Sequence, residues 1–383
     1  MITNSSRNRP LRIVHISRNP NTGVASVISA LARAQELCGH DVSLMVLKSS
    51  SYAPPRLIQE LPYQAYWSPD LFGTAAFALH ASSGLSHRWT TSLLDTSRPL
   101  VAHYHDAWLS GALLLKHRRP GFAQVVTYHG LAAETQLMQQ PVRRAIHARW
   151  ARKVERDAHA VASVDATTPA VAQRLFGVSD QNFHHIPNGS PLFIDFAERR
   201  GTNLDIVVGH IGTIDDGKGW RITAQAIDTA RERGINAGLL IAGNGNEARL
   251  AEDWCRQRSE YCTFLGWVDD IPRDVLSRID LLAMPSRTEG MPMAALEAIS
   301  VGVPVVCTRV GGLPEIIRDG QEGCLVERNP ESFASAFATL AKDIDLLDRM
   351  RARCRQRWSD QFTDQAMESR YLELYENALF RAA

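Results

Sequence analysis

Short apolar runs alternate along the chain with stretches whose apolar residues recur at helical spacing. Residues 11–16 are mostly apolar, as expected of a strand buried on both faces of a parallel sheet. A loop containing Gly23 is expected next, then a helix over 24–37, a stop at Gly39 and a second apolar strand at 42–47. This succession predicts one βαβ unit.

The same alternation continues through the first half of the chain. Strands are predicted at 100–103, 124–128 and 160–164, and helices near 107–116, 141–157 and 168–176. The turn Pro187-Asn188-Gly189 and the polar run 198–203 then indicate a linker, so a domain boundary is expected near 190–203.

The pattern restarts after this linker. Strands are predicted at 206–211, 239–242, around Phe264, at 281–284 and at 303–306, and an amphipathic helix is predicted at 364–378. The alternation indicates an α/β fold of two doubly wound, Rossmann-like domains, 1–200 and 201–358, with a C-terminal helix, 359–383, that can pack back on the first. Ligands of such sheets bind beyond the carboxyl ends of the strands, so we expect the domains to face each other across a cleft.

Composition and charge narrow the function classes. With 45% hydrophobic and 22% charged residues, the chain has the composition of a folded globular protein. Its 42 basic and 41 acidic residues give a formal charge of +1, so no overall field would hold nucleic acid, and no nucleic-acid partner is expected. The six cysteines form no CxxC pair, which favours reduced thiols. We find no apolar leader and no run of about eighteen apolar residues, so a cytoplasmic protein is expected, with attachment to the inner membrane surface left open.

The segment 284–302 carries the most informative chemistry. It is typical of a strand end, a loop and a helix, with Pro292 suited to the first helical position and Gly302 to the position just past the helix end. Glu289 then lies in the loop and Glu297 within the helix. Free N–H groups at the helix start favour a diphosphate beside Glu289.

Two carboxylates that flank an anion site are better suited to accepting hydrogen bonds from hydroxyl groups than to binding the anion. A ribose diol and a sugar both offer such hydroxyls, so the pair Glu289 and Glu297 favours a nucleotide sugar. An amphipathic helix with one solvated glutamate fits the spacing equally well.

Several segments, taken together in their order along the chain, resemble the retaining nucleotide-sugar glycosyltransferases of family 4. They are 285–297, Gly212-Thr-Ile-Asp-Asp-Gly-Lys-Gly219, 241–245, 264–268, 187–189, 310–315 and, in the first half, the Gly23 loop and Val125-Val-Thr-Tyr-His-Gly130. The resemblance covers nearly the whole chain and implies the glycosyltransferase-B fold. Each segment alone is a weak signal, and the combination is specific.

The resemblance implies roles for individual residues. Glu297 would bind the donor ribose, Glu289 would lie by the transferred sugar, and Lys218 would neutralise the donor diphosphate as its charge rises. His129 would lie near the donor sugar and the reacting centre, with His105 as a second choice. The alternatives are a solvated loop lysine for Lys218 and a hydrogen-bonded interior histidine for His129.

The remaining donor-binding residues are implied mainly through their backbone. Glycines at the ends of strands let N–H groups approach phosphates, and one position after a strand would meet the nucleobase through its main chain. These residues are Gly23, Gly212, Thr213, Gly243, Val268, Gly290, Met291 and Pro292. Val268 is the position assigned to the base.

The chain departs from the family pattern at Thr213, where members commonly carry arginine. Losing that cation should weaken donor binding or transfer the task to another basic group. Arg287, just ahead of Glu289, is a candidate, and a surface arginine is its alternative.

A basic cluster is predicted on the 141–157 helix. It comprises Arg143, Arg144, His147, Arg149, Arg152, Lys153 and Arg156, preceded by Lys116, His117, Arg118 and Arg119. Relatives that act on lipid-linked acceptors suggest peripheral contact with an anionic membrane. The alternative is a solvated charged face, which Glu155 and Asp157 favour.

We therefore expect a retaining glycosyltransferase that moves a hexose-type sugar from a nucleoside diphosphate to a glycan or lipid-linked acceptor, in polysaccharide or glycolipid assembly. Region 49–98 would select the acceptor. The resemblance implies no metal and no cofactor, and Asp343-Ile344-Asp345 is interpreted as a surface pair rather than a metal motif. The alternatives are a nucleotide-sugar hydrolase or epimerase with Glu289 as acid or base, and an inactive nucleotide-sugar-binding scaffold.

Overall fold

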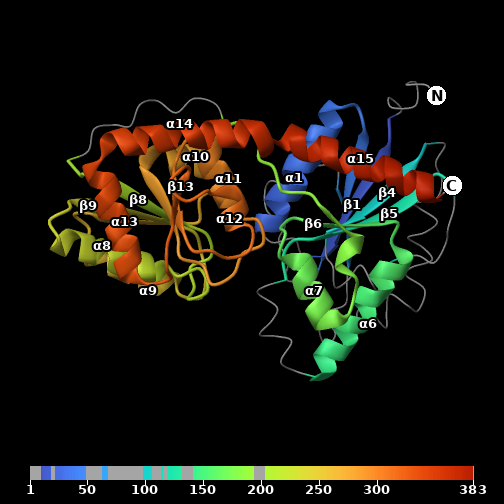
Figure 1. Ribbon diagram of the computed structural model, residues 1–383, viewed down its shortest axis with the longest axis horizontal. Helices are drawn as coiled ribbons and strands as arrows, with labels where there is room; N and C mark the ends of the chain where they lie inside the picture. Colours follow the sequence, from blue (N-terminus) through green and yellow to red (C-terminus); the bar gives the residue numbers. More distant parts are fainter. Residues whose placement is uncertain are drawn as a thin grey trace. The chain divides into compact units, whose positions relative to one another are not determined.

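The computed structural model describes residues 10–18, 22–48, 63–67, 98–105, 114, 120–131, 141–193 and 203–382. Two compact units are present: a first unit, Met1–Asn188 with Asp364–Ala383, and a second unit, Gly189–Thr363 (Figure 1). The predicted helix near 107–116, most of the region 49–98 and the polar run 198–203 fall largely outside the described residues.

The first unit is built on a parallel sheet of seven strands in the order β3-β2-β1-β4-β5-β6-β7. The order reverses between β1 and β4, which makes this a doubly wound sheet. The strands are β1 (Arg12–Arg18), β2 (Asp41–Lys48), β3 (Tyr63–Trp67), β4 (Leu100–Tyr104), β5 (Phe122–Tyr128), β6 (Ala160–Ser163) and β7 (Phe183–His185). The described helices are α1 (Thr22–Leu37), α6 (Pro141–Asp157), α7 (Thr168–Phe176), the 3-10 turn η4 (Asp180–Asn182) and α15 (Asp364–Ala382).

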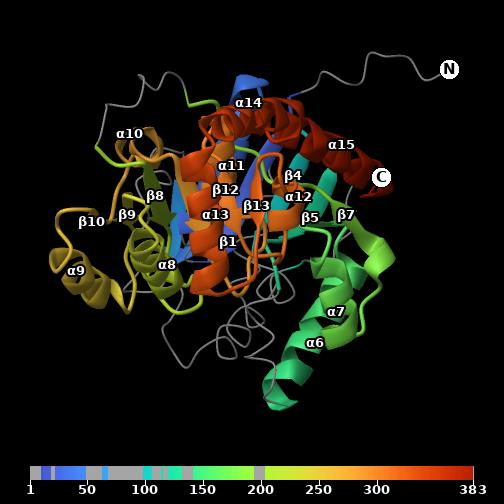
Figure 2. The ribbon, with the colours of Figure 1, turned by 60° about the vertical axis from the view of Figure 1, so that its left-hand side comes forward.

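Side chains of opposite parity leave opposite faces of this sheet. Even-numbered residues of β4 and β5, such as Ala102 and Val126, pack in one core with Val154 of α6 and Phe176 of α7. Helices α6 and α7 lie side by side on this face (Figure 2). Odd-numbered residues face α1 and α15, which contact each other.

The second unit holds a parallel sheet of six strands in the order β10-β9-β8-β11-β12-β13, which reverses between β8 and β11. Its strands are β8 (Ile206–Ile211), β9 (Ala237–Ala242), β10 (Cys262–Gly266), β11 (Leu281–Met284), β12 (Val305–Cys307) and β13 (Gly323–Leu325). Its helices are α8 (Trp220–Glu232), α9 (Ala248–Arg256), α10 (Ile271–Asp274), η5 (Leu276–Arg278), α11 (Met293–Ser300), α12 (Leu313–Ile316), α13 (Pro330–Lys342) and α14 (Ile344–Gln361).

The expected α/β fold with two doubly wound sheets is confirmed, and two local predictions are wrong. Helix α1 begins at Thr22, so Gly23 lies in its first turn and not in a loop. Pro292 is the N-cap of α11, with ψ 127°, so the helix begins one residue later than predicted. Its extended backbone explains the shift, because a residue inside the helix needs a negative ψ. Gly302 has φ +80°, as a residue just past a helix end requires.

Within the described ranges, no helix is both long enough and apolar enough to cross a bilayer.

Candidate functional site

The two loops that follow β8 and β11 meet at the point where the second sheet reverses its order. Lys218 in the first loop places its Nζ 2.7 Å from both carboxylate oxygens of Glu289 in the second. Ser286 donates a hydrogen bond to Glu289 Oε1 at 2.7 Å. A doubly wound sheet binds ligands beyond the carboxyl ends of its strands at such a reversal. The two predicted residues are therefore brought together where this topology places a ligand site.

Burial differs between the two partners. The Glu289 side chain is 5% exposed and that of Lys218 is 33% exposed. The negative charge of the buried Glu289 carboxylate is thus neutralised by Lys218 inside the protein, while part of the Lys218 ammonium faces solvent. An incoming anion can reach Lys218 from that side and replace part of its hydration.

Main-chain hydrogen bonds hold this edge of the sheet together. Gly212 N donates to Ala242 O, and Gly243 N donates to Gly266 O at 2.7 Å, which links the ends of β8, β9 and β10. Arg287 N donates to Gly217 O at 2.8 Å and joins the loops after β8 and β11.

Two glycines are required here by close backbone approach. A Cβ on Gly243 would lie 1.8 Å from Gly212 O, and one on Gly311, whose φ is +52°, would lie 1.9 Å from Glu289 O. Gly312 N also donates to Gly290 O. The backbone of the glycine pair before α12 thus packs directly against the backbone of the Glu289 loop.

Glu297 lies half-buried in α11, within the predicted helix. Burial raises the pKa of its carboxyl group to about 7. The carboxylate form is therefore poorly solvated, and hydroxyl donors from a ligand would stabilise it.

Two arginines contact the loop that contains Thr213. Thr213 is exposed, and Arg287 is 51% exposed and ion-paired with Asp216 at 2.8 Å. Arg328, which the sequence analysis did not single out, donates to Pro285 O at 2.9 Å and to Asp216 O. Burial, and then the charge of Arg287, lower the pKa of Arg328. Arg328 ties the two site loops together with bonds to neutral carbonyl groups.

A cavity of about 440 Å³ opens beside the end of β10. Gly243, Phe264 and Trp267 line it together with one face of α9. Val268 follows Trp267 directly. The position assigned to the nucleobase is therefore next to a cavity at the edge of the second sheet.

His129 follows β5 in the first unit and is partly exposed. Its Nε2 lies 3.0 Å from Nδ1 of His105, which follows β4. Burial lowers the pKa of His129 to about 4, so its ring is neutral at physiological pH. The structure thus brings both predicted histidines together. Their association with Lys218 and Glu289 of the second unit stays a prediction, as does that of Gly23, which is exposed.

Two family models match the chain. A family model described as glycosyl transferases group 1 matches residues 205–343, and one described as Glycosyltransferase Family 4 matches residues 21–192. The chain belongs to glycosyltransferase family 4. Both units of the chain are matched, each by its own model.

Curated relatives align with part of this chain. The N-acetyl-alpha-D-glucosaminyl L-malate synthase of Bacillus anthracis is 32% identical over 38% of this chain and 39% of its own. The lipopolysaccharide core biosynthesis glycosyltransferase LpsE of Rhizobium meliloti is 33% identical over 54% of this chain and 62% of its own. The chain thus spans less than two thirds of either relative.

A crystal structure of Anabaena HepE in complex with UDP and glucose shares the fold. It has a TM-score of 0.73 and 17% identity, and the alignment covers 95% of this chain and 99% of that one. The glycosyltransferase-B architecture expected from the sequence is therefore confirmed.

Other residues at the site carried weaker sequence signals. His210 is the next-to-last residue of β8. Its Nδ1 is hydrogen-bonded to the Thr223 hydroxyl at 3.1 Å, and its buried Nε2 has no partner in the described part of the chain. Burial, and then the charge of Lys218, lower the pKa of His210 to about 3. The sequence signal for His210 was its position just before the glycine-containing loop 212–219. Ser286 was visible inside the 285–297 segment, whereas Arg328 had no local signal.

Helix α6 carries the predicted basic cluster. The side chains of Arg144, Arg149, Arg152 and Arg156 are exposed, while that of Arg143 and residues 116–119 lie outside the described set. Arg156 is paired with Asp157 at 2.7 Å. Contact of this helix with a membrane stays a prediction.

The Asp343-Ile344-Asp345 triplet is exposed, and Asp343 is the N-cap of α14, where its Oδ1 accepts a hydrogen bond from Leu346 N. Asp343 thus has a structural role at the start of α14.

Proposed function

We propose that this glycosyltransferase moves a hexose-type sugar from a nucleoside diphosphate to a glycan or lipid-linked acceptor with retention of anomeric configuration. The observation that carries the proposal is the contact of Lys218 with Glu289 where the sheet order reverses. A partly exposed ammonium there is suited to a diphosphate, and a buried carboxylate beside it is suited to sugar hydroxyls.

The donor would lie along the carboxyl edge of the second sheet. Its diphosphate would contact Lys218, its ribose would reach Glu297, and its base would enter the cavity beside Trp267. The reversal point lies between β8 and β11, so two and a half strand spacings of about 4.8 Å bring the cavity beside β10 roughly 12 Å from it. A nucleoside diphosphate can span that distance. Uridine is the first base to test, because the HepE structure holds UDP.

In the proposed step, the bond from the anomeric carbon to the diphosphate oxygen breaks and its electron pair stays on that oxygen. The acceptor hydroxyl attacks from the same face, and its proton passes to the leaving phosphate. Lys218 stabilises the charge that develops on the diphosphate, an interaction stronger in the transition state than in the ground state. Arg328 would supply the second positive charge that Thr213 cannot, since its guanidinium is bonded to carbonyl groups and lies between the two loops. No metal ion is required by this scheme.

Donor screening tests the proposal. Purified protein is heated with UDP-, GDP-, ADP- or dTDP-sugars in EDTA, and one donor should raise the unfolding temperature by mass action. NMR of the product formed with an acceptor should then show the donor's anomeric configuration. Lys218→Met should abolish the shift, whereas Arg233→Met, which breaks an ion pair with Glu331 at the other end of α8, should keep it.

Release of free sugar or of an epimer at equal rates with and without acceptor would favour the hydrolase or epimerase instead. A temperature shift without any turnover would favour the inactive scaffold.

A further inference from the structure

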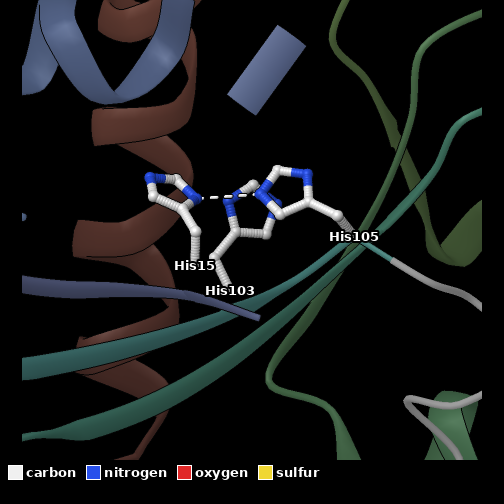
Figure 3. A group of neighbouring side chains, drawn as sticks. All are labelled: His15, His103 and His105. Atoms are coloured by element: carbon white, nitrogen blue, oxygen red, sulfur yellow. Dashed lines mark hydrogen bonds between the residues drawn. The ribbon is translucent and has the colours of Figure 1, made fainter. Parts of the chain in front are cut away.

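A group of polar side chains is buried on the face of the first sheet that α1 and α15 cover. His15 of β1, His103 of β4 and Thr127 of β5 are all odd-numbered residues on that face, and the register aligns His15 with His103. His105 continues the same face just past β4. Figure 3 shows the three histidine rings gathered above the strands, with His15 bonded to His105. The reversal of strand order between β1 and β4 places this cluster at the first sheet's switch point.

One chain of hydrogen bonds leads from Gln35 of α1 to His129. Gln35 Oε1 lies 2.8 Å from His15 Nε2, and His15 Nδ1 lies 2.8 Å from His105 Nε2. His105 Nδ1 lies 3.0 Å from His129 Nε2. Each inner histidine therefore uses both ring nitrogens.

A second chain leaves the same glutamine in the other direction. Gln35 Nε2 donates to the Tyr375 hydroxyl at 3.3 Å, and that hydroxyl lies 2.7 Å from His103 Nδ1. His103 Nε2 lies 2.7 Å from Thr127 Oγ1, which contacts the Tyr371 hydroxyl at 3.0 Å. In the structure the Gln35 amide nitrogen faces Tyr375 and its oxygen faces His15.

An amide oxygen only accepts, so it fixes the direction of every bond along the first chain. His15 must carry its proton on Nε2, which leaves Nδ1 to accept from His105 Nε2–H. His105 Nδ1 then accepts from His129 Nε2–H. A neutral imidazole has one proton, so Nδ1 of His129 is left as a lone pair. That nitrogen is buried and has no hydrogen-bond partner in the part of the chain that the structure describes.

The rings remain neutral because burial opposes their protonation. It lowers the pKa of His15 and of His129 to about 4 and that of His103 and His105 well below the usual value. His15, His103 and His105 are also close enough to hold a metal ion. A metal would need the lone pairs that now accept from His105, Tyr375 and His129, so it would break three of these bonds.

We propose that Gln35, acting through His15 and His105, holds His129 as the Nε2–H tautomer, so that Nδ1 is a permanent acceptor for a substrate hydroxyl. Gln35, His15 and His105 are positioning residues, and His129 is the residue that meets the substrate. The role in catalysis rests on the proposed transferase function. The tautomer itself does not, because it follows from contacts within the first unit.

Nitrogen NMR of histidine-labelled protein reads the tautomer directly. Long-range proton–nitrogen spectra, assigned with His129→Asn, should show His129 with an unprotonated Nδ1 and a protonated Nε2, unchanged from pH 6 to pH 8. In Gln35→Leu the His129 signals should move toward a mixture of tautomers, and kcat should fall about tenfold with little change in the KM of the donor. In Gln35→Glu an ionised carboxylate still accepts from His15, so the His129 tautomer should be kept even though the donation from the amide nitrogen to Tyr375 is lost.

The matched control is Gln124→Leu. Gln124 is a buried glutamine of β5 on the opposite face, where its amide oxygen accepts from the Tyr104 hydroxyl, and its loss should leave the His129 tautomer unchanged. A protonated Nδ1 on wild-type His129, an unaltered tautomer in folded Gln35→Leu, or stoichiometric zinc bound by these histidines in elemental analysis would each overturn the inference. If wild type shows the expected tautomer but turns over no donor, the transferase proposal fails and the tautomer assignment stands.

Discussion

Replacing Lys218 by methionine removes the cation that holds both oxygens of Glu289 and keeps much of the side-chain volume. The structure predicts two separate losses. The folded protein would keep a buried carboxylate that loses its cation and still accepts a hydrogen bond from the Ser286 hydroxyl, and the proposed site would lose the charge that stabilises the leaving diphosphate.

The stability loss can be bracketed from burial. Removing one partner of a fully buried ion pair costs roughly 3 to 5 kcal/mol, whereas an exposed pair contributes about 1 kcal/mol or less. Glu289 is 5% exposed, but Lys218 is 33% exposed, so its charge is partly screened by water. We therefore expect a destabilisation of about 2 kcal/mol, which lowers the unfolding temperature of a unit of this size by about 4 to 8 °C.

A double variant separates the two losses. In Lys218→Met/Glu289→Gln the buried group is neutral and its amide oxygen can still accept from Ser286, so most of the stability should return. Activity should not return, because the cation is still missing, and loss of one such electrostatic contact lowers kcat by about 10²- to 10³-fold. Unfolding curves and steady-state turnover on wild type, both single variants and the double variant give the complete cycle.

Two results would refute this reasoning. If the double variant is as unstable as Lys218→Met, the uncompensated carboxylate is not the source of the loss. If Lys218→Met turns over donor at the wild-type rate, Lys218 does not stabilise the leaving group.

Two further predictions concern the neighbours of this pair. The carboxyl pKa of Glu297 is raised to about 7 in the folded protein, so this carboxyl group ionises at lower pH in the unfolded chain than in the folded one. Its contribution to the free energy of unfolding should therefore fall as pH rises from about 4.3 to 7. A ligand that donates hydroxyls to the ionised form should bind more tightly as pH rises through 7. Calorimetry should therefore show a steeper increase of affinity with pH in wild type than in Glu297→Gln. Equal pH dependence of affinity in the two proteins would contradict this prediction. Gly311→Ala should destabilise the protein by roughly 2 to 5 kcal/mol and weaken donor binding, because backbone strain adds to a clash with Glu289 O. The control Gly320→Ala also has a positive φ but open space around it, so it should cost about 1 kcal/mol of stability and leave donor binding intact. Equal losses of stability for the two variants in thermal unfolding would exclude the clash.

Much of the fold could be predicted because the strands are buried on both faces. Ile206–Ile211 and Leu281–Met284 are continuous apolar runs, and the structure has both strands with the predicted bounds. Helices Pro141–Asp157 and Thr168–Phe176 also have the predicted bounds. Strands β3, β7 and β13 were not predicted. Both β7 and β13 have three residues, which carry little periodic signal, whereas β12, of the same length, was predicted from the apolar run 303–306.

The site was predictable where one segment supplies it. Glu289 lies in a loop between a recognisable strand and a recognisable helix, so its place at the carboxyl edge followed from local pattern. Arg328 bonds to a residue 112 positions earlier in the chain, and no local pattern connects the two. Its role depends on β13 and the loop beyond it, an element that the sequence analysis did not find.

The histidine cluster was even harder to predict from local sequence patterns. His15, His103 and Thr127 come from three strands, and each is unremarkable within its own segment. They meet because β1 lies beside β4 and β4 beside β5, and because all three have the parity that faces α15. A one-residue slip in any of these strands would turn its side chain to the opposite face. The tautomer of His129 is therefore set by strand order and register together with Gln35, and only a structure brings these together.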